Sequence, residues 1–218
     1  MQVRGRDGLS MPVLGWAKPW VQCHGPLHIV KTGPLLLRSP TKRESQIAAA
    51  GASDDEAQRW LGWADASVWP EHLRVKLLAE HADARESPAQ PVPSLSGFAL
   101  LIAIDVERSA VAGQTCIMAI PEGPPQVGGW LVPRYRGRGL GRELFAAALA
   151  LGHQHLGIEV LRAGAESSNT ASRRSLRGAG FEPSHGSPTH QLEDGRTVAA
   201  CWYEHAAPTS TCGGTTWS

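Results

Sequence analysis

The stretch Tyr135-Arg136-Gly137-Arg138-Gly139-Leu140-Gly141-Arg142 decides how this chain is expected to fold. It follows the apolar residues Trp130-Leu131-Val132, which are typical of a strand, and it leads into a segment with apolar residues at helical spacing. The start of a helix exposes backbone N–H groups that have no partner within the helix, and glycines let an anionic group approach them closely. Since Arg136, Arg138 and Arg142 add positive charge, the stretch predicts a site for a diphosphate.

Other interpretations of the glycine stretch agree less well with the residues around it. A P-loop ends in Gly-Lys-Ser/Thr, whereas Leu140-Gly141-Arg142 provides neither the lysine nor the hydroxyl. A dinucleotide-binding fold places its glycines near the start of a repeated βαβ pattern, and its ribose-binding carboxylate ends a strand, whereas Glu159 begins one. The third alternative is a tight glycine turn with solvated arginines, and only the surrounding sequence argues against it.

Strand and helix patterns around the stretch predict a mixed α/β (α+β) fold with a central, mostly antiparallel sheet flanked by helices. Before the stretch, Gly and Pro separate three strand-like segments that predict an antiparallel meander: Leu95 to Asp105, Val111 to Ile120 and Gln126 to Val132. After the stretch we expect a helix over 140–155, a strand over 158–163, a helix over 169–179 and a hairpin of 189–192 with 197–204.

Two further helices are predicted before the meander. Ser53-Asp54-Asp55-Glu56 matches a capping box and opens a helix that carries Trp60 and Trp63 on one face. Pro70 suits the first turn of the next helix, whose apolar residues recur toward Ala84.

The expected domain organisation is one domain over 35–205 with two appendages. Residues 1–34 hold several prolines and no sustained periodicity, which predicts an irregular extension, and residues 206–218 are rich in Thr, Gly and Ser, which predicts a disordered tail. The domain itself is expected to begin with the strand Leu35-Leu36-Leu37-Arg38.

Composition points to a cytoplasmic protein without a metal, nucleic-acid or membrane partner. The net charge is +1, so no global field attracts nucleic acid or an anionic membrane. The apolar run from Phe98 to Ile104 is too short to span a bilayer, and the N-terminus lacks a signal-peptide pattern. The 4 cysteines form no C-x-x-C pair, which argues against a zinc site and a disulfide framework.

The glycine stretch resembles the Arg/Gln-x-x-Gly-x-Gly/Ala signature with which the GNAT (general N-acetyltransferase) superfamily holds the diphosphate of acyl-CoA. A second element agrees, because Asn169-Thr170-Ala171-Ser172, followed by Leu176 and Gly180-Phe181, is similar to the superfamily's Asn-x-x-Ser/Ala…Gly-Phe helix. Smaller similarities at 35–40, 59–63 and 194–196 extend the resemblance over roughly 35–205, which it implies to be an N-acetyltransferase domain. They are most similar to the branch of ribosomal-protein N-terminal alanine acetyltransferases.

The resemblance implies acetyl-CoA as cosubstrate. The residues implied to contact it are Leu131, Val132, Arg136, Gly137, Arg138, Gly139, Leu140, Gly141, Arg142 and Asn169. By the same resemblance, pantetheine lies along the strand that ends at Val132, and a backbone N–H near Leu131 and Val132 stabilises the oxyanion. Gly128-Gly129 within that strand separately suggests a bulge or a close backbone approach.

Two groups that are common in the superfamily are missing from this chain. The tyrosine that protonates the leaving thiolate corresponds to Leu176, so Ser172, one turn earlier, becomes the candidate to hydrogen-bond the sulfur. The alternative for Ser172 is a surface serine that bonds its own backbone. The glutamate that begins the cofactor strand corresponds to Gln126, which cannot accept a proton, and the identity of the general base stays open.

The predicted function is transfer of an acetyl group from acetyl-CoA to a primary amine by direct attack in a ternary complex. The acceptor is a protein N-terminus or a small molecule, and the missing carboxylate favours an amine of low pKa, such as an N-terminus at about 8. The enzyme is expected to be a monomer or a homodimer. The alternatives are a catalytically silent acyl-CoA-binding regulatory module and an NAD-dependent oxidoreductase.

Overall fold

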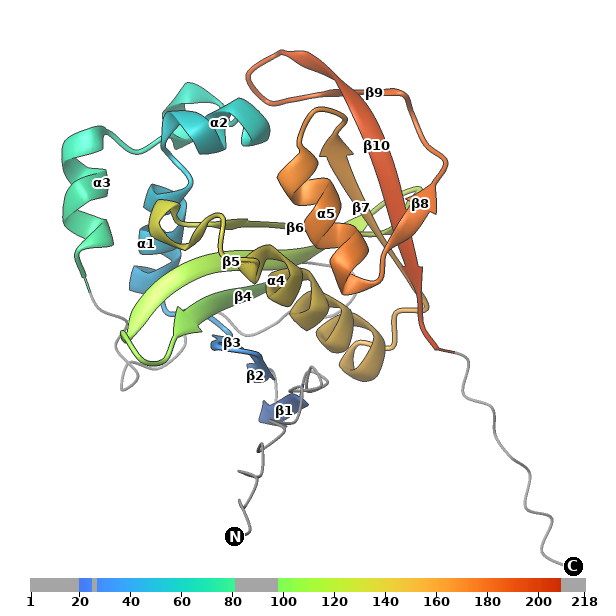
Figure 1. The fold of residues 1–218 in the computed structure, drawn as a ribbon, viewed down its shortest axis with the longest axis horizontal. Coiled ribbons are helices and arrows are strands. Elements are labelled where there is room, and N and C mark those ends of the chain that lie inside the picture. The colour runs from blue at the N-terminus through green and yellow to red at the C-terminus, as the bar shows by residue number, and fades with distance from the viewer. Residues whose placement is uncertain (1–19, 25–26, 81–97, 209–218) are drawn as a thin grey trace, which may run out of the picture.

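The structure is a computed structural model that describes residues 20–24, 27–80 and 98–208 (Figure 1). The predicted irregular start over residues 1–19 and the predicted tail from residue 209 onward lie outside the described residues. Of the predicted helix that runs toward Ala84, the part beyond Glu80 lies outside them too.

A sheet of 10 strands forms the centre of the molecule, in the order β1-β2-β3-β4-β5-β6-β7-β10-β8, with β9 paired to β10 (Figure 1). The strands are β1 Trp20–His24, β2 Leu27–Thr32, β3 Leu35–Arg38, β4 Phe98–Asp105, β5 Ala110–Ile120, β6 Gly123–Leu131, β7 Val160–Glu166, β8 Glu182–Ser184, β9 Thr189–Gln191 and β10 Thr197–Ala206. Neighbouring strands are antiparallel except β6 and β7, which are parallel. The predicted meander and closing hairpin are confirmed.

The helices are α1 Lys42–Gly51, α2 Asp55–Leu61, α3 Glu71–Leu78, α4 Leu140–Leu149, which continues as a π-helical segment Ala150–His155, and α5 Thr170–Ala179. The sheet is covered on both faces, with α1 and α3 on one face and α4 on the other (Figure 1). Along β4, Leu101 packs in the α4 cluster while Ile102 packs with Ile47 of α1. Because both faces of β4 are buried, its sequence is continuously apolar instead of alternating.

Part of the predicted irregular extension belongs to the central sheet. β1 and β2 form an antiparallel hairpin, and β2 pairs with β3 through Val30 opposite Leu37. Burial alternates along the strand, since His28, Val30 and Thr32 are buried while Lys31 is exposed. This alternation is short and lies between two Gly-Pro pairs, so it predicts a strand only weakly. Pairing with β3 stabilises the strand.

Helix boundaries differ from the sequence prediction at α2. Its N-cap is Asp54, whose side chain accepts from the Ala57 N–H at 3.2 Å, and not Ser53. The Ser53 hydroxyl instead donates to the Ala49 carbonyl at 2.9 Å. Gly62 ends α2 in a left-handed conformation, so Trp63 lies beyond the helix and does not share a helix face with Trp60.

A buried contact ties the N-terminal hairpin to α4. The Thr32 hydroxyl donates to Glu143 Oε2, and Glu143 is only 6% exposed. Its other oxygen accepts from Arg142 at 3.1 Å and 3.3 Å. Both carboxylate oxygens are therefore bonded, as a buried carboxylate requires.

Replacing Thr32 with Val should destabilise the fold by about 1–3 kcal/mol, because Glu143 Oε2 then loses its buried donor while the side-chain shape is kept. Urea unfolding followed by circular dichroism measures the change. Thr189→Val, on the exposed strand β9, is the matched control and should change stability by less than about 0.5 kcal/mol. Equal stability of Thr32→Val and wild type would show that the contact does not hold the hairpin to α4.

Candidate functional site

The parallel strands β6 and β7 share a single paired position, Gln126 opposite Arg162, and then separate. In Figure 1, β6 runs across the view while β7 rises toward the top. On its other side β6 stays paired to β5 up to Leu131. The backbone groups of β6 that face β7 beyond Gln126 therefore have no strand partner, and such an edge can pair with an extended ligand that carries amide groups.

The register with β5 decides which backbone groups of β6 face this divergence. The Val132 N–H donates to the Ala112 carbonyl at 3.0 Å, so Leu131 and Gly113 form a non-hydrogen-bonded pair and the Leu131 N–H points away from β5. The Val132 carbonyl also accepts, from the Tyr135 N–H at 2.9 Å. Both backbone groups of Val132 are thus hydrogen-bonded inside the protein, whereas the Leu131 N–H points toward the divergence.

The predicted bulge at Gly128-Gly129 is absent. β5 and β6 keep one register from Leu131 back to Gln126, and the irregularity lies between Met118 and Ile120. The predicted close approach is present, because a Cβ at Gly129 would lie 2.8 Å from the Gln114 carbonyl oxygen.

The glycine loop follows β6 and opens directly into α4. Gly137 and Gly139 have φ of +71° and +76°, and an added Cβ at either would meet nothing within 4 Å. They are needed for their left-handed backbone, and the space beside them is open. Gly139 is the N-cap of α4 and supplies no side-chain hydrogen bond, whereas α1, α2 and α5 begin with side-chain caps. The N-terminus of α4 therefore keeps its N–H groups and positive dipole end for a ligand.

Gly141 brings the second predicted motif against the first. A Cβ there would lie 2.5 Å from Ser175 Oγ, so α5 packs closely on α4. Asn169, predicted as the first residue of this helix, is its N-cap and accepts from the Ser172 N–H at 3.0 Å. Ser172 is half-buried in the first turn, and Leu176 is 1% exposed within the core. The position of the family tyrosine is thus occupied by a core residue.

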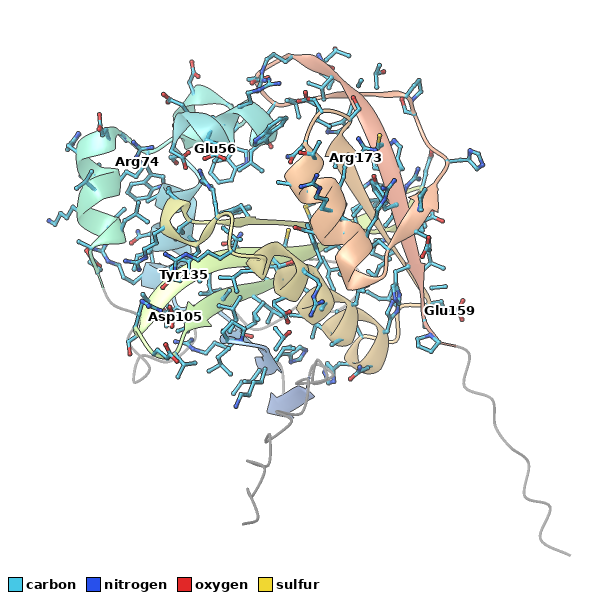
Figure 2. All side chains as sticks on the ribbon, in the orientation of Figure 1. Glu56, Arg74, Asp105, Tyr135, Glu159 and Arg173 are labelled. Atoms are coloured by element: carbon cyan, nitrogen blue, oxygen red, sulfur yellow. The ribbon has the colours of Figure 1, made fainter. Side chains whose placement is uncertain are left out.

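Helix α5 is also fixed to β10. Arg173, labelled on α5 in Figure 2, donates from Nε to the Tyr203 hydroxyl at 3.0 Å and from a terminal nitrogen to the Ser167 carbonyl at 2.7 Å. These contacts hold the start of α5 at the end of β7.

The three arginines expected at the anion site have different roles. The Arg136 guanidinium points to α2, where it donates to Asp54 Oδ1 at 2.7 Å and to Glu56 at 3.1 Å. Arg142 pairs with Glu143, as described above. Arg138 is exposed within the loop. The side chains of Arg136 and Arg142 thus pair with carboxylates of the protein, whereas that of Arg138 is exposed beside the loop glycines.

The start of the loop is held by Tyr135, whose hydroxyl donates to Asp105 Oδ2 at 2.9 Å (Figure 2). Burial raises the pKa of Tyr135, and the bond to Asp105 raises it further. Burial alone would raise the pKa of Asp105, but hydrogen bonds from Arg108 and Tyr135 lower it overall. The tyrosine is thus neutral and the carboxylate ionised at neutral pH, which suits a bond from the hydroxyl to the carboxylate.

Cys116 of β5 lies opposite Gly128 of β6 but is not a nucleophile. It is 7% exposed, and burial raises the pKa of its thiol to about 11. Because the thiolate is the nucleophilic form, an acyl-cysteine intermediate at Cys116 is disfavoured at neutral pH.

The face of the sheet opposite α4 carries groups that sequence reasoning did not connect. Trp63 and Trp130 meet edge to face with ring centroids 5.1 Å apart. Arg59 of α2 lies 3.5 Å from Glu166 at the end of β7, and Arg196, just before β10, donates to the Arg59 carbonyl at 3.1 Å. The sequence signal for Glu166 was its place three residues before Asn169, since the predicted strand ended at residue 163 while β7 continues to Glu166.

Among the described residues, no helix is long and apolar enough to cross a membrane. The same residues contain no group of three or more His, Cys, Asp or Glu side chains placed to hold a metal ion.

The Arg136–Asp54 pair should make stability depend on pH. Burial alone would raise the pKa of Asp54, but the hydrogen bonds from Arg136 and from the Ala57 N–H lower it overall. A carboxyl whose pKa is lower in the folded state stabilises the fold above its unfolded pKa of about 3.9, and this contribution is lost as the pH falls through the folded pKa.

Asp54→Asn keeps an N-cap but removes the charge, so it should lower the free energy of unfolding at pH 7 by about 1–2 kcal/mol. The difference from wild type should shrink below about pH 4, as urea unfolding at several pH values would show. Asp55→Asn, an exposed neighbour in the same turn, controls for lost negative charge at the helix start. A difference that does not depend on pH would contradict an ion-pair role.

Comparison with known proteins gives a family assignment. The family described as acetyltransferase (GNAT) domain matches residues 34–182. No curated protein matches the sequence.

Solved structures share the fold at low sequence identity. An acetyltransferase of the GNAT family from Bacillus anthracis has a TM-score of 0.60 and 15% identity, covering 82% of this chain and 98% of that chain. Spermidine N-acetyltransferase from Vibrio cholerae, in complex with CoA and spermine, has a TM-score of 0.58 and 13% identity over 79% of this chain and 95% of its own. Ribosomal-protein-S5-alanine acetyltransferase from Vibrio fischeri has a TM-score of 0.54 and 15% identity over 83% and 97%.

The family match covers more than half of the chain, and it includes the divergence of β6 and β7, the glycine loop and both motif helices. This chain belongs to the GNAT acetyltransferase family.

Proposed function

We propose that this protein transfers the acetyl group of acetyl-CoA to a primary amine, by direct attack within a ternary complex. The observation that carries the proposal is the continuity of two binding features. The unpaired edge of β6 leads into the glycine loop, and the loop leads into the uncapped start of α4. Pantetheine amides suit the strand edge, and a diphosphate suits the helix start. The GNAT match and the CoA-bound relative support the same ligand.

The chemistry follows from the groups along this path. The amine nitrogen attacks the thioester carbonyl carbon, and the Leu131 N–H is placed to donate to the oxyanion that forms. When the carbon–sulfur bond breaks, the thiolate needs a proton, for which we propose the Ser172 hydroxyl as hydrogen-bond donor. Attack on a bound thioester gains much of its rate from holding both substrates together. Since the Cys116 thiol is protonated and buried, direct transfer is preferred to a covalent enzyme intermediate.

The acceptor belongs to the class of primary amines, either a protein N-terminus or a small molecule. Among the relatives, the Vibrio fischeri protein is named for a ribosomal-protein alanine and the Vibrio cholerae protein for spermidine. A second candidate function is a silent acyl-CoA-binding module, which the core position of Leu176 and the amide at Gln126 favour. Thiol release in the presence of an amine separates the two.

Isothermal titration with acetyl-CoA, CoA and NAD tests the cofactor. Wild type should bind acetyl-CoA and CoA but not NAD. The double variant Arg138→Glu/Gly139→Glu should bind acetyl-CoA at least about 30-fold more weakly, which corresponds to a loss of about 2 kcal/mol in charge-assisted hydrogen bonds.

Arg134→Glu is the matched control, because Arg134 is exposed just before the loop and its replacement changes the overall charge without changing the loop. It should retain acetyl-CoA affinity. A folded wild type that binds no acetyl-CoA would overturn the proposed function and leave the glycine loop as a structural turn.

A further inference from the structure

Glu166, at the carboxyl end of β7, has a buried carboxylate oxygen without a partner. Its side chain is 13% exposed. Oε1 accepts from the Ser168 hydroxyl and lies 3.5 Å from an Arg59 nitrogen. Oε2 is buried and has no hydrogen-bond partner among the described residues. A buried, unsatisfied carboxylate oxygen is costly, so it indicates a group that binds there.

The strand register places Glu166 beside the divergence of β6 and β7. The two strands meet at Gln126 opposite Arg162, and counting the same number of residues onward along each strand reaches Trp130 on β6 and Glu166 on β7. Because side chains alternate along a strand, both lie on the same face as the paired position. The neighbouring residues Val127 and Leu161 point the other way, into the core under α4.

This face is the one covered by α1, because the Trp130 indole N–H donates to the Ala48 carbonyl of α1 at 2.9 Å. Trp130 and Glu166 therefore flank the divergence on the α1 side, opposite α4. With the cofactor bound to the glycine loop at the start of α4, this is the side from which a second substrate can approach the strand edge.

The groups around Glu166 suit an alkylammonium. Trp63 stacks edge to face on Trp130, so aromatic surface lies on one side of the divergence and a carboxylate on the other. Aromatic rings and carboxylates both attract cations, and together they recognise a protonated amine. The charged groups on the packed elements are Arg59 from α2, Arg162 from β7, Arg196 just before β10, and Glu204 from β10.

Other carboxylates near this face are already paired or exposed. Asp54 and Glu56 bind Arg136, and Glu204 is 38% exposed and lies 3.8 Å from Arg162. Glu122 is exposed in the turn that precedes the paired part of β6. Among the acidic residues that the structure describes, Glu166 alone combines burial with an unpaired oxygen.

We infer that Glu166 is the catalytic base of this enzyme, and that its Oε2 binds the acceptor ammonium and takes the proton that the nitrogen loses during acetyl transfer. The inference rests on the proposed function. The bound ammonium first gives one proton to Glu166 Oε2, which releases it to solvent. The freed nitrogen lone pair then forms the bond to the thioester carbonyl carbon, and the carbon–sulfur bond breaks with its electron pair going to sulfur. The second nitrogen proton also passes to Glu166 Oε2, which releases it to solvent and becomes a carboxylate again. The thiolate takes a proton from solvent, with the Ser172 hydroxyl as its hydrogen-bond donor. Glu166 thereby supplies the carboxylate that Gln126 lacks.

The test compares Glu166→Gln with wild type in the full chain, with acetyl-CoA and three probe amines: an alanine-initiated peptide amide, spermidine and an aminoglycoside. Gln keeps the shape and can still accept from Ser168, so the fold should be retained. With the acetylated probe, kcat/KM at pH 7 should fall by about 100-fold, and the acid limb of the wild-type pH profile should be lost. Glu166→Asp keeps a carboxylate but places it farther from the acceptor nitrogen, because the side chain is shorter, so this variant should show an intermediate rate.

Glu204→Gln is the matched control, since it makes the same chemical change on the same sheet face, and it should keep the wild-type rate. Acetyl-CoA affinity should be unchanged in all variants. A Glu166→Gln enzyme with wild-type kcat and an unchanged pH profile would overturn the inference, as would a rise in KM alone. Acetyl-CoA binding without turnover of any probe would also overturn it. Failure of the proposed function shows separately, as a wild type that does not bind acetyl-CoA.

Discussion

The separation of β6 and β7 after one paired position is the constraint on which the rest of this molecule depends. In a sheet that is otherwise antiparallel, these two parallel strands cannot be joined by a tight turn, so the chain leaves β6, forms α4 and returns to β7. This crossover places the glycine loop at the end of β6 and the start of α4 beside the unpaired strand edge. The binding features therefore share one end of the sheet as a consequence of topology.

Fixed polar contacts keep that end of the sheet in shape. Arg136 joins the loop to α2 through Asp54, and Tyr135 joins it to the end of β4 through Asp105. On the other side Arg173 holds α5 to Tyr203 of β10. Each contact satisfies partly buried charges that burial would otherwise penalise. Because Tyr135 and Arg136 hold the start of the loop in place, the loop keeps its shape although no side chain caps the first N–H groups of α4.

The sheet also separates two kinds of chemistry. On the α4 face, the glycine loop and helix start suit a phosphorylated cofactor. On the α1 face, Trp130 and Glu166 suit a cation. Beyond Gln126 and Arg162, β6 and β7 are not paired, so hydrogen-bonded strands do not separate the two faces of the sheet there. Under the inference above, this position brings the Glu166 carboxylate to the amine that attacks the thioester.

The sequence by itself determined those features that depend on local chemistry. The position of the glycine stretch between a strand and a helix, the helix stopped by Gly180, the meander and the closing hairpin follow from backbone conformation and periodicity, and these were predicted correctly. Only the tertiary structure decided which partner each polar group takes. It bonded Val132 to β5, turned Arg136 toward Asp54, paired β2 with β3, and left one carboxylate oxygen of Glu166 without a partner among the described residues. Such contacts join residues far apart along the chain, and local preferences carry no information about which of them will meet.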